Sequence, residues 1–168
     1  MNNVKNLVGA RLSQSSVMKS DIGELKTNIE IGSMYLYFYD PKLKEELPFY
    51  DTFPLVLPFS PAKGGFYGIN LHYLPYLLRA QVLGELLDYK TTKTYSETTK
   101  MRMSYNLLNN LKNANEVKPC IKHYLTNHVN SQFLKVNPED WQAAIFLPIE
   151  NFVGATKEQV FRDSRSKF

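Results

Sequence analysis

Apolar and polar positions along the first half of the chain follow patterns typical of β-strands. Residues 33–39 are rich in aromatic side chains, residues 53–59 form an apolar run between prolines, and residues 66–73 form a third such segment. Gly64 lies in the short turn between the second and third segments, and Gly68 marks a bulge or a close approach of two backbones. These segments predict a small antiparallel meander, or its closure into an SH3-like barrel.

The spacing of apolar positions changes from residue 75 onward. Leucines and valine at intervals of three and four predict a helix over residues 75–88. A capping box formed by Thr94 and Glu97 predicts the start of a second helix. Pro119 would begin a third helix, whose apolar face extends to Phe133.

The C-terminal third mixes a short turn, an apolar run and a terminal helix. Residues 137–141 resemble a capped single turn, and the continuous apolar run 143–149 predicts a buried strand that pairs with the meander. Thr156 and Gln159 form another capping box ahead of a short helix. With three to four helices beside the meander, the sequence predicts an α+β fold over residues 32–168.

Residues 1–31 read as an N-terminal arm outside that single domain. Apolar residues are sparse there, and Ser13 to Ser16 form a polar patch. Such a segment buries too little apolar surface to offset its ordering entropy by itself. It is therefore either disordered or laid across a neighbouring subunit.

Length and composition exclude several classes of protein. The chain has 168 residues, of which 43% are hydrophobic and 21% charged, values that exclude a wholly disordered chain. No apolar run approaches the roughly 20 residues of a membrane-spanning helix, and no secretory signal is readable at the N-terminus. Cys120 is the single cysteine, which excludes a disulfide within the chain. We expect a reduced, intracellular setting and no membrane association.

Positive charge is concentrated in one part of the sequence. The formal net charge is +4, but residues 90–135 hold eight Lys or Arg against two Glu, a net +6. Such a stretch either neutralises phosphates of double-stranded DNA or keeps a helical surface soluble. Lys118 and Lys122, four residues apart, would share a face of the third helix. The candidate phosphate contacts are Lys100, Arg102, Lys118, Lys122, Lys135, Arg162 and Arg165.

Three tyrosines of the first strand form a second candidate surface. By the two-residue period of a strand, Tyr35, Tyr37 and Tyr39 project to one side, and Leu36 and Phe38 to the other. The tyrosine side is either a protein interface, where tyrosine is favoured, or a half-exposed sheet face.

Signals for catalysis, a metal or a cofactor are weak. His123 and His128 are five residues apart, which misses the spacing of two zinc ligands on one helix face, and no glycine pattern matches a phosphate-binding loop. Asp40 and Asp51, with Lys42, Lys44 and Lys63 nearby, offer the residue types of a metal-dependent nuclease without a recognisable spacing. We therefore predict no catalytic residue, no metal and no cofactor, and keep a DNA-end-processing nuclease as an alternative.

Several segments together resemble a known family. They include the run Asn70-Leu71-His72-Tyr73-Leu74-Pro75, and the full set is residues 34–42, 47–56, 65–75, 118–122 and 160–165. These segments resemble small virion structural proteins of tailed bacteriophages, chiefly large myophages, some of which are labelled DNA end protector. The resemblance spans about residues 32–166.

The resemblance implies a non-enzymatic role in the phage particle. A member of this family would be made in the host cytoplasm and placed in the virion, in the head, neck or portal region. As a connector or head-completion component, it would contact portal, neck or capsid proteins in a symmetric assembly, and double-stranded DNA or its ends. The N-terminal arm carries only +1 over residues 1–33, which argues against DNA binding through the arm. A tail or baseplate adaptor without DNA contact is a further alternative.

Overall fold

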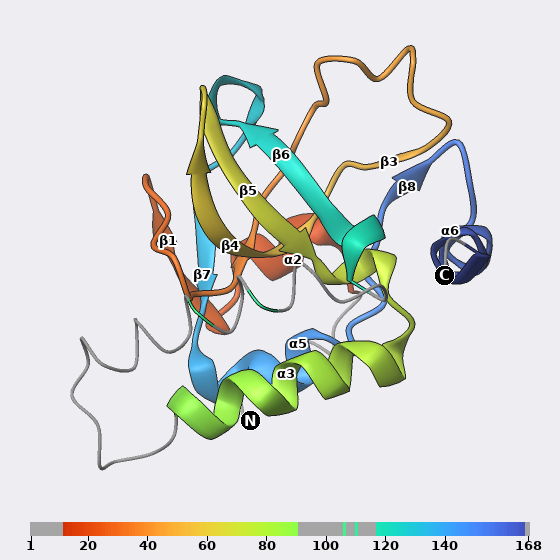
Figure 1. Ribbon diagram of the computed structural model, residues 1–168. Coiled ribbons are helices and arrows are strands. Elements are labelled where there is room, and N and C mark those ends of the chain that lie inside the picture. Colours follow the sequence, from red (N-terminus) through yellow and green to blue (C-terminus); the bar gives the residue numbers. More distant parts are fainter. Residues whose placement is uncertain (1–11, 91–105, 107–109, 111–116, 167–168) are drawn as a thin grey trace.

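A computed structural model describes residues 12–90 and 117–166, together with Asn106 and Asn110 (Figure 1). Six strands form an antiparallel sheet in the order β1–β7–β2–β4–β5–β6, and β3 pairs with β8 in a separate ribbon. The α+β class is therefore confirmed, whereas SH3-like closure is not.

The strands are β1 (Gly23–Lys26), β2 (Tyr35–Leu36), β3 (Tyr50–Asp51), β4 (Leu55–Ala62), β5 (Gly65–Asn70), β6 (Ile121–Leu125), β7 (Phe133–Val136) and β8 (Phe152–Val153). The described helices are α2 (Gln14–Met18), α3 (Tyr76–Lys90), α5 (Trp141–Ala144) and α6 (Lys157–Ser166), with short 3-10 turns η1 (Leu71–Tyr73), η2 (Lys118–Cys120), η3 (Thr126–His128) and η4 (Pro138–Asp140).

The β4–β5 hairpin is the longest pairing of the sheet, and glycines shape it. Gly64 adopts a φ of 77° in the turn, a conformation that favours glycine. The register shifts between Pro58 and Ser60, opposite Gly68. The predicted bulge is therefore confirmed. The close approach at Gly68 is to a side chain and not to a backbone, since a Cβ atom there would collide with Val56.

The strand predicted over residues 33–39 is shorter than expected. Only Tyr35 and Leu36 pair with β4 and β7. Beyond them the chain leaves the ladder, and Tyr39 forms an isolated bridge with Val129. This bridge joins the continuation of β2 to the segment that follows the edge strand β6, so the sheet curls toward itself.

One face of the sheet forms the main hydrophobic core. Leu36, Leu57 and Ile69 on this face are fully buried, together with Trp141 of α5 and Val160 of α6. Figure 1 shows α3 and α5 running along one end of the sheet, and α6 to its side. Local sequence signals placed two of these helices correctly, since α3 covers the predicted residues 75–88 almost entirely and the predicted capping box precedes α6.

The other face of the sheet carries a second core, the aromatic cluster. It consists of Tyr35, Tyr37, Tyr39, Val56, Phe66, Tyr124 and Phe133. Tyr37 lies at its centre, with ring centroids 5.0 Å from Phe133 and 5.6 Å from Tyr124. The predicted alternation of the tyrosines with Leu36 is confirmed. Their assignment to a protein interface is wrong, because the curl of the sheet leaves Tyr35 and Tyr37 fully buried and Tyr39 only 7% exposed.

The third predicted helix is also wrong. The residues after Pro119 form β6, the turn η3 and then β7. Ile, Tyr and Leu suit a strand, and Gly65 of β5 lets the β6 backbone approach, since a Cβ atom there would collide with the Tyr124 carbonyl. Pairing with β5 therefore overrides the helical spacing, and Lys118 and Lys122 do not share a helix face. The helix expected from Thr94 lies outside the described residues.

The structure also corrects the predicted strand over residues 143–149 and the predicted N-terminal arm over residues 1–31. Residues 143–149 complete α5 and continue as turns rather than a strand, although Ile145, Leu147 and Ile149 are buried as expected. Of the predicted arm, residues 12–31 belong to the folded core: β1 pairs with β7, and Val17 and Ile22 are fully buried. Residues 1–11 lie outside the described part of the chain.

The tyrosine hydroxyls of the aromatic cluster differ in their hydrogen bonds, and this difference predicts how removal of each one changes stability. The Tyr35 hydroxyl accepts the Glu30 N–H at 2.7 Å and the Tyr39 hydroxyl accepts the Leu125 N–H at 2.9 Å, whereas the buried Tyr37 hydroxyl has no hydrogen-bond partner among the described residues. We expect Tyr37→Phe to leave the free energy of unfolding unchanged or to raise it by about 1 kcal/mol, and Tyr35→Phe and Tyr39→Phe to lower it by about 1 kcal/mol each. Urea unfolding measures all three, and an equal loss in all of them would contradict this interpretation.

Candidate nucleic-acid interface

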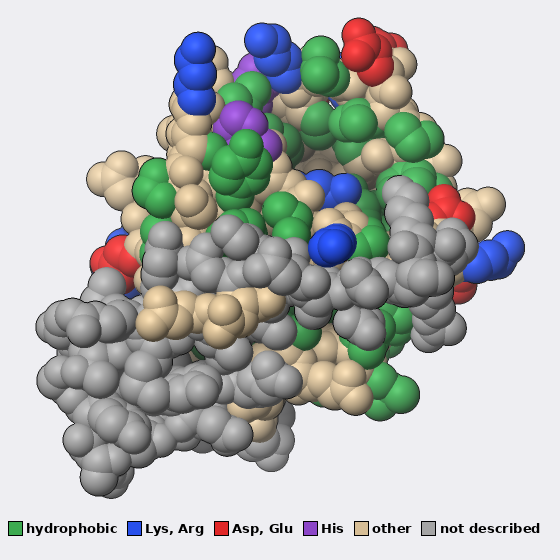
Figure 2. All heavy atoms as spheres, in the orientation of Figure 1, with side chains coloured by type: hydrophobic (Ala, Val, Ile, Leu, Met, Phe, Trp, Pro, Cys, Tyr) green, Lys and Arg blue, Asp and Glu red, His purple; other side chains and the backbone are tan. Residues whose placement is uncertain are grey.

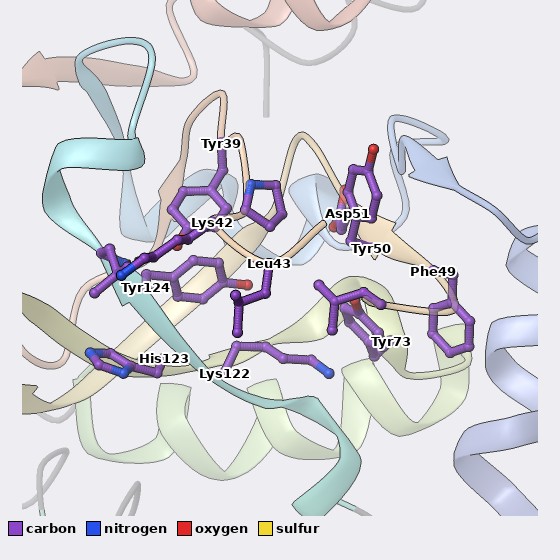
Figure 3. Close-up of a pocket in the computed structure, with 13 residues that line it drawn as sticks. Tyr39, Lys42, Leu43, Phe49, Tyr50, Asp51, Tyr73, Lys122, His123 and Tyr124 are labelled. Carbon is purple, nitrogen blue, oxygen red and sulfur yellow. Dashed lines mark hydrogen bonds between the residues drawn. The ribbon is translucent and has the colours of Figure 1, made fainter. Parts of the chain in front are cut away.

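A pocket of about 320 Å³ opens between the edge strand β6 and the loop that joins β2 to β3 (Figure 3). Figure 3 shows Lys122 and Tyr124 pointing into it from β6, while the His123 ring points to the other side of the strand. This alternation is the two-residue period of a strand. The lining residues are Tyr39, Pro41, Lys42, Leu43, Leu47, Phe49, Tyr50, Asp51, Tyr73, Lys122, His123, Tyr124 and Leu125.

The loop that forms the outer wall of the pocket is held at both ends. At its start, the Asp40 N–H donates to the His128 carbonyl at 3.0 Å, next to the bridge of Tyr39 with Val129. At its end, β3 pairs with β8. Lys44 and Asp40 form an ion pair at 2.9 Å within the loop. The pocket is thus a consequence of how β3 is anchored.

Asp51 anchors β3 in the interior. One carboxylate oxygen accepts the Phe53 N–H at 3.0 Å, and the other lies 3.0 Å from Asn70 Nδ2 and 2.9 Å from His72 Nδ1. Burial alone would raise the pKa of Asp51, but attraction to His72 and the hydrogen bonds from His72, Asn70 and Phe53 hold it below its ordinary value. Both carboxylate oxygens are therefore used inside the protein.

A second buried charge, Arg79 of α3, continues this network. Its guanidinium donates to the carbonyls of Leu74 at 2.8 Å, Ile145 at 2.8 Å and His72 at 3.1 Å. It also lies 2.8 Å from the Glu150 carboxylate, and both side chains are almost completely buried. Burial would raise the pKa of Glu150, but the charges of His72 and Arg79 lower it below its ordinary value.

The walls of the pocket are neutral aromatic rings with a cation beside them. Burial raises the pKa of Tyr73 and of Tyr124, so both phenols stay protonated at physiological pH. Lys122 Nζ lies 4.1 Å from the centroid of the Tyr73 ring, a cation–π contact that holds its charge at the pocket wall.

Lysines lie in the lining of the pocket and on the turns next to it. Lys42 on the loop, Lys63 at the hairpin turn and Lys118 at η2 are exposed, and His123 Nε2 lies 3.0 Å from the Lys63 carbonyl. Figure 2 shows Lys and His side chains over the tip of the β4–β5 hairpin and beside a hollow at β6. Lys42 and Lys122 line the pocket itself. The loop also carries two exposed acidic residues, Glu45 and Glu46.

The predicted phosphate contacts that the structure describes lie on separate elements. Lys118 and Lys122 lie together on the segment of η2 and β6. Lys135 lies on β7, where its Nζ is 2.7 Å from a Glu30 oxygen, and Arg162 is exposed on α6. Three predicted contacts lie outside the described residues, namely Lys100, Arg102 and the side chain of Arg165.

Sequence reasoning missed the aromatic half of the site and assigned its lysines to another chemistry. By sequence, Lys42 and Lys63 group with the carboxylates of a nuclease, and Tyr73 belongs to a predicted strand. The Lys63-Gly64 turn could have signalled an exposed cation at a hairpin tip. The nuclease carboxylates do not converge: Asp40 pairs with Lys44, and Asp51 is buried. In the described part of the chain, no three His, Cys, Asp or Glu side chains are placed to hold a metal ion.

The sequence matches the model of one protein family over residues 5–166, and that family is the phage T4 terminal DNA protecting protein. The chain belongs to this family. The resemblance to phage proteins labelled DNA end protector is therefore confirmed. No curated protein and no solved structure matches the chain. Among the described residues of this family member, no helix has the length and apolar character needed to cross a membrane.

The buried carboxylates predict how the stability of the protein depends on pH. In the folded state the pKa values of Asp51 and Glu150 lie below their ordinary values of 3.8 and 4.5. Their stabilising effect is present above those ordinary values and is lost as the pH falls through the folded-state values. We therefore expect the free energy of unfolding to fall steeply below a pH of about 4.

Asp51→Asn tests this assignment. Removing one member of a buried charge network should lower the free energy of unfolding by about 3–5 kcal/mol at neutral pH and flatten its decline in acid. Urea unfolding across the acid range measures both effects, with the exposed Glu139→Gln as a matched control. If the free energy of unfolding fell as steeply in acid for Asp51→Asn as for the wild type, Asp51 would not be a source of the pH dependence.

Proposed function

We propose that this protein is a non-enzymatic phage protein that binds the ends of double-stranded DNA and protects them by occupying them. Membership of the terminal DNA protecting protein family over residues 5–166 is the observation that carries this proposal. Occupation of an end blocks access to it without any bond being made or broken, so the proposed activity needs no nucleophile, metal or cofactor.

The basic surface around the pocket is the part of the described chain best suited to the phosphates of a DNA end. Lys42 and Lys122 line the pocket from the loop and from β6. Two exposed lysines lie on neighbouring turns: Lys118 in η2, directly before β6, and Lys63 in the turn of the β4–β5 hairpin. Each lysine that neutralises a phosphate releases counterions, so binding through this surface would depend strongly on salt. Lys135 and Arg162 fit this surface less well because they lie on other elements.

A non-enzymatic role is supported by what the reactive side chains already do. Asp51 and His72 hydrogen-bond to each other in the interior, and Asp40 pairs with Lys44. Burial raises the pKa of the Cys120 thiol to about 12, which keeps it protonated and unreactive. None of these groups combines exposure with the pairing that activates a nucleophile or a base.

We also propose that the protein acts in the virion, in the head, neck or portal region, as one subunit of a symmetric assembly. DNA that has been packaged needs its protector at the place where its end lies, which favours contact with portal, neck or capsid proteins. The tyrosines once considered for such contacts are buried, so the proposal assigns no contact residues. Cross-linking in purified particles, followed by mass spectrometry, should yield links to a head, portal or neck protein; links confined to tail or baseplate proteins would favour the adaptor alternative.

DNA-end binding predicts a preference for linear over circular DNA. The purified protein should shield linear duplex DNA from an exonuclease and should compete poorly for closed circles of the same sequence. The double variant Lys118→Ala/Lys122→Met should weaken binding by about tenfold per lysine near 0.1 M salt, and should reduce the slope of log affinity against log salt by about 2. Electrophoretic mobility shifts over a range of salt concentrations measure the affinity and the slope.

Lys135→Ala is the matched control, because it removes one lysine whose charge is already paired with Glu30. Its affinity for linear DNA should stay close to that of the wild type. If the double variant and Lys135→Ala protected linear ends equally well, the DNA would not be bound through Lys118 and Lys122. Equal affinity of the wild type for linear and circular DNA would overturn end binding itself.

A further inference from the structure

The pocket beside β6 has features that phosphate binding alone does not require. Its volume of about 320 Å³ lies at the small end of the range for ligand sites, roughly 300–1,000 Å³. Its lining includes the aromatic residues Phe49, Tyr50, Tyr73 and Tyr124. A surface that only contacts phosphates needs cations and hydrogen-bond donors, and gains nothing from a hollow of rings.

A nucleotide matches both halves of this lining. Its base offers a flat π face, which stacks on aromatic side chains whatever its sequence. Phe49 supplies a half-buried ring on one wall. The buried Tyr73 ring supports it, with centroids 6.1 Å apart and planes tilted by 35°. Lys122 lies over the Tyr73 ring, and Lys42 lines the same pocket from the loop, so two cations accompany the rings.

We propose that this pocket holds the terminal nucleotide of a DNA end, with its base unstacked from the duplex and lying against Phe49. The phosphate of that nucleotide contacts Lys122, and Lys42 adds positive charge from the loop. This inference rests on the proposed binding of DNA ends and names the part of the DNA that the protein recognises.

The two cations of the lining favour a nucleotide over an apolar side chain of another protein. Lys42 and Lys122 both line the pocket. The phosphate of a nucleotide is attracted to their positive charges, and an apolar occupant gains no such attraction. Asp51 also lines the pocket, but its carboxylate is buried and both its oxygens accept hydrogen bonds inside the protein, so it is not itself presented to a ligand.

The decisive experiment varies the DNA and leaves the protein intact. Two linear duplexes are compared, one complete and one with an abasic site in place of the terminal nucleotide's base, so that the phosphates are the same in both. The full-length wild-type protein should bind the abasic end about 5- to 100-fold more weakly, the range expected for the loss of one stacked base. An abasic site in the middle of the duplex should have no such effect.

Variants locate the effect in the pocket. Phe49→Ala should reduce the difference between the complete and the abasic end while keeping the salt dependence of binding, and Phe49→Leu covers the case in which the alanine variant is unstable. Phe146→Ala is the matched control, since this ring is 51% exposed and does not line the pocket. A photoreactive 5-iododeoxyuridine at the terminal position should cross-link to Phe49, Tyr50 or Tyr73.

The outcomes separate this inference from the proposed function. Preferential binding of linear DNA with equal affinity for complete and abasic ends would overturn the nucleotide pocket and leave end binding intact. The loss of any preference for linear DNA would overturn both. Unchanged DNA binding by the Phe49 variants, combined with their failure to enter particles, would assign the pocket to a protein partner and overturn the inference.

Discussion

The buried charges beneath the sheet are the constraint on which the rest of the structure depends. Asp51, His72, Arg79 and Glu150 are all withdrawn from water. The three charged side chains among them are tolerated because another member of the network or a backbone group pairs with each. Their hydrogen bonds join β3, the turn after β5, α3 and the segment before β8. An apolar core would hold these elements together without fixing their relative positions so narrowly, whereas a buried charge left unpaired is strongly unfavourable.

This fixed placement forms the pocket as a by-product. The network holds β3, and β3 holds the end of the loop that carries Lys42 and Phe49. On the opposite side, the aromatic cluster fixes Tyr124 and the edge strand β6. The hollow lies between two rigid bodies of side chains, so its rings and its cation are held in place before any ligand binds. Preorganisation of this kind reduces the entropic cost of binding.

What the sequence could and could not predict follows from the range of the interactions involved. The helix after Pro75 and the capping box of Thr156 depend on neighbours within one or two turns, and both predictions were right. Whether Lys122 lies on a helix or a strand depends on β5, about 50 residues earlier, so the local spacing misled the prediction. The burial of Tyr37 depends on the curl of the whole sheet. Nothing local in the sequence indicates that Arg79 is buried, because arginines are mostly exposed.

Selective recognition of a DNA end poses an energetic problem, which the arrangement of this site can solve. Lysines bind phosphates equally well along the whole duplex, so charge alone cannot distinguish an end from the interior. Removing a base from the stack costs a few kcal/mol, and the cost is smallest where pairing is weakest. A terminal base has only one stacking neighbour to lose, whereas an internal base has two. A ring-lined pocket beside cations would therefore convert the ease of unstacking at a terminus into a preference for ends, without reading any sequence.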